Sequence, residues 1–178
     1  MPIQLHLACG RRFIPGFIHI DARKFPHINY VTDVSKLDMF LDNTVDLIYA
    51  SHILEHFERY NVDKVLKEWY RVLKTGGILR LAVPDFEKLI EIYKKYGNME
   101  LIMGPLHGGQ TYKENFHYIS FDFNYLKAKL ESIGFKNIHR YRWQDTIHKD
   151  YDDFSQSYIP HMQKETGTLI SLNVEAEK

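Results

Sequence analysis

Short runs of apolar residues recur along the first half of the chain and have the length of β-strands. They cover residues 3–8, 17–20, 28–31, 45–50 and 78–83. Because the runs are nearly continuous rather than alternating, they are typical of strands buried on both faces of a parallel sheet. Two further strand-like runs follow later in the chain, at residues 137–143 and 168–175.

Three stretches repeat their apolar residues at the spacing of an amphipathic helix. The first begins at Asn61 and is closed by a pair of glycines at positions 76 and 77. The second is capped by Asp85 and ends near Gly97, and the third runs from about Asp122 to Gly134. Strands that alternate with helices in this way predict an open α/β sheet.

Residues 98–120 and 144–167 remain as two long irregular segments, which we name the first and second roof segments. A helix that feeds a parallel strand starts at the carboxyl side of the sheet, so the helix from Asp122 places the first segment there. An antiparallel last strand would place the second segment there too. Because ligands of open α/β sheets bind beyond the carboxyl ends of the strands, both segments are expected to cover a binding crevice.

Composition narrows the function classes. The 178 residues fit one domain, 1–178, with 44% apolar residues available for its core. The 23 Lys and Arg balance the 23 Asp and Glu, which disfavours nucleic acid as a partner. The single cysteine, Cys9, excludes a disulfide framework and a thiolate zinc site. The sequence has neither a membrane-length apolar run nor a secretory pattern, so we expect a cytoplasmic protein without a membrane partner.

The residues that follow the first four strands carry the strongest chemical signal. Gly10 follows the first strand, where the lack of a Cβ lets a ligand approach the backbone. Asp21 follows the second strand and can accept both hydroxyls of a ribose. Asp33 follows the third strand and can accept from an adenine amino group, and Ser51 and His52 follow the fourth. Their order predicts a nucleoside pocket at this edge of the sheet.

With these residues in place, the chain resembles a class I methyltransferase dependent on S-adenosylmethionine (SAM). The resemblance spans about residues 3–138 and rests on LHLACG with GFIHID, TDVSKL, VDLIYASHILEHF and EWYRVLKTGGILRLAVPDFE. It implies SAM as the cofactor and a single Rossmann-like, doubly wound sheet, mostly parallel with an antiparallel last strand. The cofactor-binding residues that it implies are Ala8, Cys9 and Gly10 at the methionine portion, Asp21 at the ribose, Asp33 and Val34 at the adenine, and Ser51 and His52 beside the sulfonium.

The first loop departs from the family pattern, which is Gly-x-Gly-x-Gly with an acid two positions earlier. Ala8 and Arg12 stand where the family has glycines, and His6 stands where it has the acid. Only six residues, 11–16, separate Gly10 from the second strand, so the first crossover helix is expected to be shortened or absent. Arg11 or Arg12 would then pair with the cofactor's carboxylate in place of a helix N-terminus.

Residues 52–56 also match HxxEH, a zinc-peptidase signature in which two histidines on a helix share a metal. A buried strand directly precedes His52, no long helix carries it together with His56, and the methyltransferase block accounts for the same residues. We therefore expect no metal.

Methyl transfer from a sulfonium is an in-line displacement that mainly requires positioning. A hydroxyl acceptor also profits from a general base, for which histidine is suited. The candidates are His117, His107 and His56, each of which could instead be structural. An acceptor that is an amine or an anion needs no dedicated base.

The chain is expected to methylate a small-molecule acceptor that is hydroxylated and sugar-like. Two other functions stay open at this point. The altered first loop allows a SAM-binding protein with weak or no catalysis, acting as a scaffold or sensor. A nicotinamide oxidoreductase on a related sheet would need a GxGxxG after the first strand, which this chain lacks. The sequence leaves the oligomeric state open.

Overall fold

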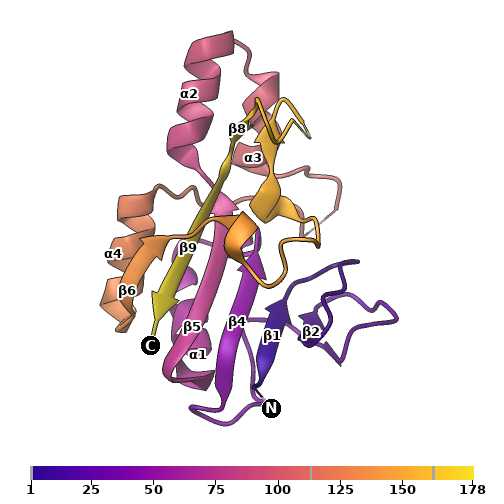
Figure 1. Ribbon diagram of the computed structural model, residues 1–178, viewed down its shortest axis with the longest axis vertical. Helices are drawn as coiled ribbons and strands as arrows, with labels where there is room; N and C mark the ends of the chain where they lie inside the picture. The colour runs from indigo at the N-terminus through magenta and orange to yellow at the C-terminus, as the bar shows by residue number, and fades with distance from the viewer. Residues whose placement is uncertain (1, 113, 162) are drawn as a thin grey trace.

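The computed structural model describes residues 2–112, 114–161 and 163–178, and its centre is a seven-stranded sheet (Figure 1). The strand order is β3-β2-β1-β4-β5-β9-β6, and a separate pair joins β7 to β8. The strands are β1 (Gln4–Leu7), β2 (Ile18–Asp21), β3 (Tyr30–Val31), β4 (Val45–Ser51), β5 (Leu73–Pro84), β6 (Lys136–Arg140), β7 (Tyr158–Ile159), β8 (Thr168–Leu169) and β9 (Ser171–Glu177).

The direction of the strands confirms the expected fold class. Neighbouring strands from β3 to β5 pair in parallel. The last strand, β9, lies between β5 and β6 and is antiparallel to both. The C-terminal strand is therefore an interior strand of the sheet, so the two ends of the chain build one α/β Rossmann-like unit.

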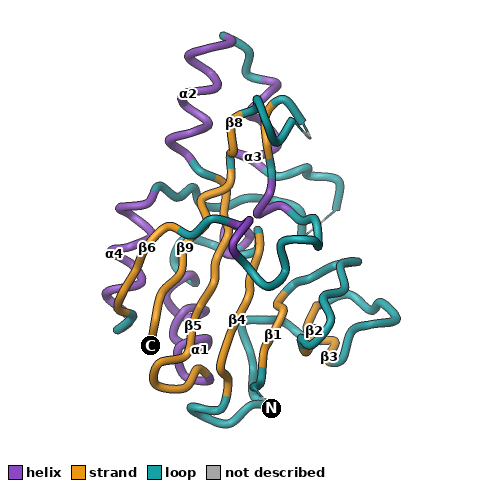
Figure 2. The backbone as a smooth tube through the Cα atoms, viewed as in Figure 1, coloured by secondary structure: helices purple, strands orange, loops and turns teal. Residues whose placement is uncertain are grey.

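Among the described residues, four helices and three short 3-10 turns accompany the sheet (Figure 2). They are α1 (Val62–Val72), α2 (Phe86–Tyr96), α3 (Glu100–His107), α4 (Phe123–Ile133), η1 (Leu54–His56), η2 (Trp143–Asp145) and η3 (Phe154–Gln156). In Figure 1, α1 lies behind the sheet, while α2 and α3 extend above its carboxyl edge. Within the described part of the chain, no helix is both long enough and apolar enough to span a bilayer.

The ends of two helices follow the predicted capping residues. Asp85 accepts hydrogen bonds from the first-turn amides of α2, and Asp122 accepts one from the first turn of α4. Gly97 and Gly134 close these helices in the left-handed conformation. The first helix ends earlier than predicted, at Val72, because the next residue already pairs with β4.

The prediction that the first roof segment is irregular is wrong for residues 100–107, which form α3. This helix contains Gly104 and Pro105, whose helix-breaking character conceals the helix in the sequence. The rest of that segment has no regular helix or strand in the described residues. The second roof segment contains only short elements, η3 and β7, besides part of η2.

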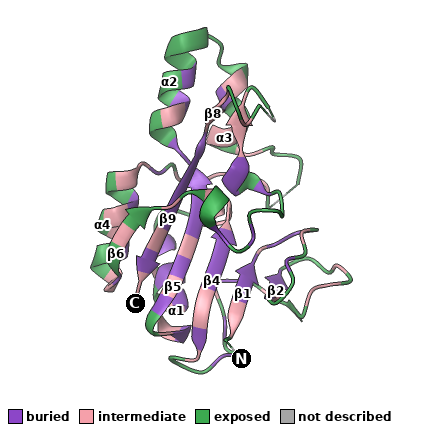
Figure 3. Cartoon of the chain, viewed as in Figure 1, coloured by how far each residue is buried: buried purple, intermediate pink, exposed green. Residues whose placement is uncertain are grey.

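One face of the sheet is apolar and packs against α1 and α4, and Figure 3 shows the buried strands at the centre of the molecule. Leu5, Leu7, Ile48, Leu79 and Leu81 from successive central strands are all at most 1% exposed. Because side chains alternate along a strand, these residues share the face that the helices cover. This core makes the central strands rigid, and their carboxyl ends can therefore hold side chains in fixed positions.

The connections from β1 to β2, β2 to β3 and β3 to β4 contain no helix, and the structure describes all of their residues. This confirms the expected loss of the first crossover helix. Side chains of α1 hold the third connection instead. The indole of Trp69 donates to the carbonyl of Val34 at 2.9 Å, and Glu68 accepts from the amide of Leu37 at 2.8 Å. Arg71 donates to two further carbonyls of this loop.

The other face of the sheet is polar and is covered by loops, with residues of the second roof segment lying in front of it in Figure 1. His6 stacks on Tyr49 with ring centroids 5.1 Å apart, and Tyr49 meets His148 at 4.0 Å. The hydroxyl of Tyr49 donates to Asp153. His6 and His148 are 2% and 1% exposed, so both imidazoles are shielded from water.

These buried histidines predict a loss of stability in acid. Burial lowers the pKa of His6, and burial together with the charge of Arg80 lowers that of His148 to about 4. The unfolded chain, with histidine pKa values near 6.5, binds more protons than the folded chain between about pH 6.5 and 4. The free energy of unfolding should therefore be highest above pH 6.5 and fall by about 1 kcal/mol per pH unit per histidine below it.

Urea unfolding at a series of pH values measures this slope. The variant His148→Phe should show a shallower decline than the wild type. His139→Ala, which removes an imidazole with 61% exposure, should retain the wild-type slope. An equal decline in His148→Phe and the wild type would contradict the assignment.

Candidate active site

A cavity of about 670 Å³ lies at the carboxyl ends of β1, β2 and β4. Its walls come from four strand ends or the loops after them, from η1 and from both roof segments. All eight residues predicted to bind the cofactor line it: Ala8, Cys9, Gly10, Asp21, Asp33, Val34, Ser51 and His52. The structure thus brings together residues that lie more than forty positions apart in the sequence.

The carboxylate of Asp21 joins the ends of β1 and β2. Its Oδ2 accepts from the amide of Gly10 at 2.7 Å, and its Oδ1 accepts from the amide of Arg23 at 2.8 Å. The residue is 4% exposed. Since a carboxylate offers about four acceptor positions, Asp21 can hold the loop and still accept from a ligand in the cavity.

The backbone explains the altered first loop. Ala8 has φ +50° and Gly10 has φ +57°, which is the left-handed region that favours glycine. Ala8 therefore adopts the conformation that the family's glycine would provide, held by its amide's 2.7 Å hydrogen bond to the carbonyl of Ile20. The strain of a left-handed alanine is about 1–2 kcal/mol, so the loop keeps its shape without the first glycine.

Asp33 and Val34 form the wall after β3. Asp33 is exposed at the rim, and its Oδ1 accepts from the amide of Ser35 at 2.8 Å. Val34 is 4% exposed, and the indole of Trp69 fixes its carbonyl. An apolar wall with an acceptor at its edge suits a flat, amino-bearing ring.

Ser51 and His52 leave the end of β4 in a strained turn. His52 has φ +50°, and its amide donates to the carbonyl of Ala82 at 2.8 Å. Its Nε2 lies 3.1 Å from the Oγ of Ser171 in β9. The Oγ of Ser51 is buried and has no hydrogen-bond partner among the described residues. Ser51 lines the cavity, and this hydroxyl has an unused hydrogen-bonding capacity beside it.

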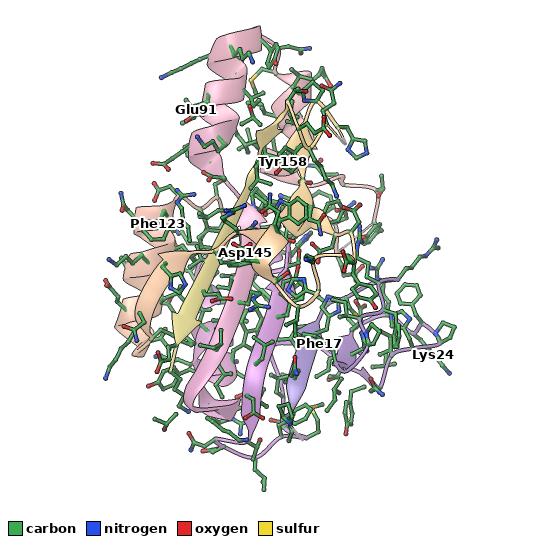
Figure 4. The ribbon with its side chains drawn as sticks, in the orientation of Figure 1. Phe17, Lys24, Glu91, Phe123, Asp145 and Tyr158 are labelled. Atoms are coloured by element: carbon green, nitrogen blue, oxygen red, sulfur yellow. The ribbon has the colours of Figure 1, made fainter. Side chains whose placement is uncertain are left out.

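Both roof segments contribute residues to the wall of the cavity. The first contributes Tyr112, Glu114, Asn115 and Tyr118, and the second contributes Asp153 and Phe154. Figure 4 shows the crowded side chains of the second segment, which includes the labelled Asp145 and Tyr158, in front of the sheet.

Two arginines connect the strand-end loops to this roof. The guanidinium of Arg23 lies 5.3 Å from the ring centroid of Tyr112. Arg12 donates to the carbonyl of Asp152 at 2.9 Å and lies over the ring of Phe154 at 4.9 Å. Arg12 lines the cavity and Arg11 is not among the lining residues, which separates the two arginines considered from the sequence.

The three histidines considered as bases occupy different places. His56 lines the cavity. His117 lies next to His56. The centroids of their two rings are 4.6 Å apart, and the ring planes meet at 85°. His107 is exposed at the end of α3 and is not among the lining residues. The structure thus brings His56 and His117 together and leaves the side chain of His107 outside.

Glu55 accompanies this histidine pair. It is 0% exposed, and its Oε1 lies 3.3 Å from Nδ1 of His52 and 4.0 Å from Nε2 of His117. Burial opposes ionisation of Glu55, but His52, His56 and His117 outweigh it, so its pKa lies below the usual value. Burial also lowers the pKa of His117.

Sequence reasoning assigned no site role to His6 or Asp153, and both line the cavity. The position of His6 two residues before Ala8, where the family has an acid, was the available signal. Asp153 lies in the second roof segment, almost 150 positions after His6 in the sequence. No spacing in the sequence indicated its contact with Tyr49.

Comparison with known proteins agrees with this geometry. A family model for a methyltransferase domain matches residues 13–81. The ubiquinone/menaquinone biosynthesis C-methyltransferase UbiE of Haemophilus ducreyi is 31% identical over 126 residues, which cover 65% of this chain and 47% of that protein. A demethylmenaquinone methyltransferase of Bacteroides fragilis is 39% identical over 105 residues, which cover 56% of this chain and 39% of that protein. The chain spans about half the length of these relatives or less.

Solved structures share the fold. A SAM-dependent methyltransferase from Archaeoglobus fulgidus aligns with a TM-score of 0.63 and 17% identity, covering 99% of this chain and 86% of that one. The 1,6-didemethyltoxoflavin-N1-methyltransferase of Burkholderia thailandensis, solved with its substrate and S-adenosylhomocysteine, aligns with a TM-score of 0.61 and 15% identity, covering 99% and 71%. In its strand order, its sequence blocks and these relatives, the chain is similar to class I SAM-dependent methyltransferase domains, and residues 13–81 match the methyltransferase domain family directly.

Proposed function

We propose that this protein binds SAM in the cavity at the carboxyl edge of the sheet and transfers its methyl group to a small hydroxylated acceptor under the roof segments. The observation that carries this proposal is the convergence of all eight expected cofactor residues on one cavity. The whole chain, 1–178, would act as one domain, since β9 completes the sheet between β5 and β6.

The donor half of the cavity fits SAM. Asp21 retains acceptor positions for ribose hydroxyls after bonding two amides. Val34 offers an apolar wall for the adenine, and Asp33 offers an acceptor beside it. Arg12, on the cavity wall, supplies the cation for the amino acid carboxylate. The volume of about 670 Å³ lies within the range of small-molecule sites. Bound SAM supplies a methyl group that its positively charged sulfur already activates.

The acceptor half is mixed in polarity. Phe57 and Phe154 offer apolar surface, while Asn61, Glu58 and Tyr118 offer groups that pair with hydroxyls. The volume of about 670 Å³ suits a small molecule, and the balanced net charge of the chain disfavours a polyanionic acceptor. In-line transfer then depends on how these side chains orient the acceptor. A base role for a histidine stays a prediction, and the donor half does not depend on it.

Binding of SAM is tested at Asp21. The variant Asp21→Asn keeps the size of the side chain but replaces one carboxylate oxygen with an NH2 group. This group can no longer accept a hydrogen bond from a backbone amide or from a ribose hydroxyl. We expect SAM affinity to fall by about 1–3 kcal/mol, the cost of an unpaired buried polar group. Calorimetric titration of the variant measures this loss. Asp38→Asn alters an exposed carboxylate away from the cavity and should bind SAM like the wild type. A folded Asp21→Asn with unchanged affinity would remove Asp21 from the site.

Turnover is tested with a panel of sugars, phenols and quinols in the presence of SAM. We expect SAM at one hundred times its dissociation constant to stabilise the protein by about 2.7 kcal/mol. We also expect at least one acceptor to release S-adenosylhomocysteine, detected by mass spectrometry. Stabilisation without product across the panel would favour the alternative of a SAM-binding protein without catalysis.

The thiol of Cys9 lies in the donor half and reports on its environment. It is 4% exposed, and burial together with the charge of Asp21 raises its pKa to about 12. At pH 8 the thiolate fraction is about a thousandfold lower than for a thiol of ordinary pKa.

Alkylation by iodoacetamide at pH 8 should therefore be at least about a thousandfold slower in the folded protein than in urea. As the chain has one cysteine, the mass of the intact protein follows this single reaction. Similar rates in both states would contradict the buried position of Cys9.

A further inference from the structure

A buried carboxylate and two imidazoles face one another at the wall of the cavity. Glu55 and His56 lie on η1, and His117 lies in the first roof segment. One ligand atom from each of these three side chains lies within 4.8 Å of the others. We propose that Glu55, His56 and His117 bind one divalent transition-metal cation of the Zn²⁺ type.

The burial of Glu55 is the first reason. Its side chain is 0% exposed, and neither of its oxygens has a hydrogen-bond partner in the part of the chain that the structure describes. Nδ1 of His52, at 3.3 Å from Oε1, lies outside hydrogen-bond geometry. The nearby imidazoles offset part of the cost of burying this charge, but both oxygens still lack a hydrogen bond, which coordination of a cation would replace.

The orientation of His117 is the second reason. Its Nδ1 lies 2.8 Å from the carbonyl oxygen of Pro105. This oxygen can only accept, so Nδ1 carries the proton and Nε2 presents its lone pair to Glu55. Metal-binding histidines typically donate their other ring N–H to a carbonyl or carboxylate in this way. The amide of His117 donates to the carbonyl of His107 at 3.1 Å, and that of Tyr118 donates to the carbonyl of Glu55 at 2.8 Å. Both segments are therefore held in place.

His56 opens the cluster to the cavity. Its Nδ1 is buried without a hydrogen-bond partner among the described residues. Its ring lies nearly perpendicular to that of His117 and lines the cavity. Two imidazoles and one carboxylate with an open position form the donor set of catalytic zinc sites. Mg²⁺ and Ca²⁺ prefer sites made of oxygen ligands.

This cluster differs from the pair that the HxxEH spacing suggests. That signature joins His52 to His56 on a helix, but residues 54–56 form one 3-10 turn, and Nε2 of His52 lies beside Ser171. His117 takes the second histidine position from a distant segment. In the sequence, we expected no metal because no long helix carries His52 together with His56. That reason concerns this histidine pair and does not apply to the cluster of Glu55, His56 and His117.

Because His56 lines the cavity, a cation held by this cluster would lie at the cavity wall, and the consequence drawn from that rests on the proposed function. A cation there would hold an oxygen of the acceptor and lower the pKa of its hydroxyl, so that the proton passes to solvent water before the oxygen takes the methyl group. The acceptor class is therefore a molecule with a hydroxyl that can reach the metal, and no dedicated protein base is then needed.

The test is a titration of tag-free protein, cleared of metal by a chelator, with Co²⁺, whose visible absorption reports its coordination. We expect one equivalent to bind and Zn²⁺ to displace it. Glu55→Gln and His117→Gln should each weaken Co²⁺ binding about tenfold or more. His139→Gln removes an imidazole that is 61% exposed and should leave Co²⁺ affinity unchanged. SAM affinity, measured in every variant, shows that the donor half is folded.

The absence of a saturable Co²⁺ spectrum in the wild type overturns the proposal. A Co²⁺ spectrum that is unchanged in both Glu55→Gln and His117→Gln overturns it as well. If either variant fails to bind SAM, His56→Gln is titrated in its place. Co²⁺ binding without methyl transfer to any acceptor leaves the metal site standing and removes the proposed function. Methyl transfer that persists without a Co²⁺ spectrum removes the metal site alone.

Discussion

The carboxylate of Asp21 determines the geometry on which the rest of the site depends. By accepting one amide from Gly10 and one from Arg23, it fixes the loop after β1 against the loop after β2. The loop that it fixes contains Ala8 and Gly10, both in the left-handed conformation. Arg23 then meets Tyr112, so the same constraint reaches the first roof segment. A single buried carboxylate thus positions the strand-end loops that line the cavity and, through Arg23, a residue of the first roof segment.

The loss of three crossover helices changes how the sheet is stabilised. One face keeps an apolar core under α1 and α4, whereas the other is polar and covered by loops. Side chains of α1 hold the loop after β3, and buried contacts of Tyr49 with His148 and Asp153 hold the second roof segment. The roof is therefore attached through polar groups that respond to pH.

Much of the fold could be predicted from the sequence because its signals are local. Apolar runs mark the strands, and Asp85, Asp122, Gly97 and Gly134 mark helix ends through capping chemistry. The cofactor residues could be predicted because parallel strands bring their carboxyl ends to one edge. The helix α3 could not, since Gly104 and Pro105 weaken its pattern while tertiary packing of Ile102 against α2 stabilises it.

The contacts between distant segments were beyond sequence reasoning for a different reason. Nothing local indicates that His117 meets Glu55 and His56, because that contact depends on how the first roof segment crosses η1. The same holds for Asp153 beside Tyr49. Such pairs come from the tertiary path of loops, which carries no periodic pattern.

A crystal structure with S-adenosylhomocysteine tests the central claim most directly. We expect the ribose hydroxyls to lie within hydrogen-bond distance of Asp21, with the adenine beside Val34 and the homocysteine over Ala8 and Gly10. A nucleoside bound elsewhere, or bound in this cavity with its ribose turned away from Asp21, would contradict it.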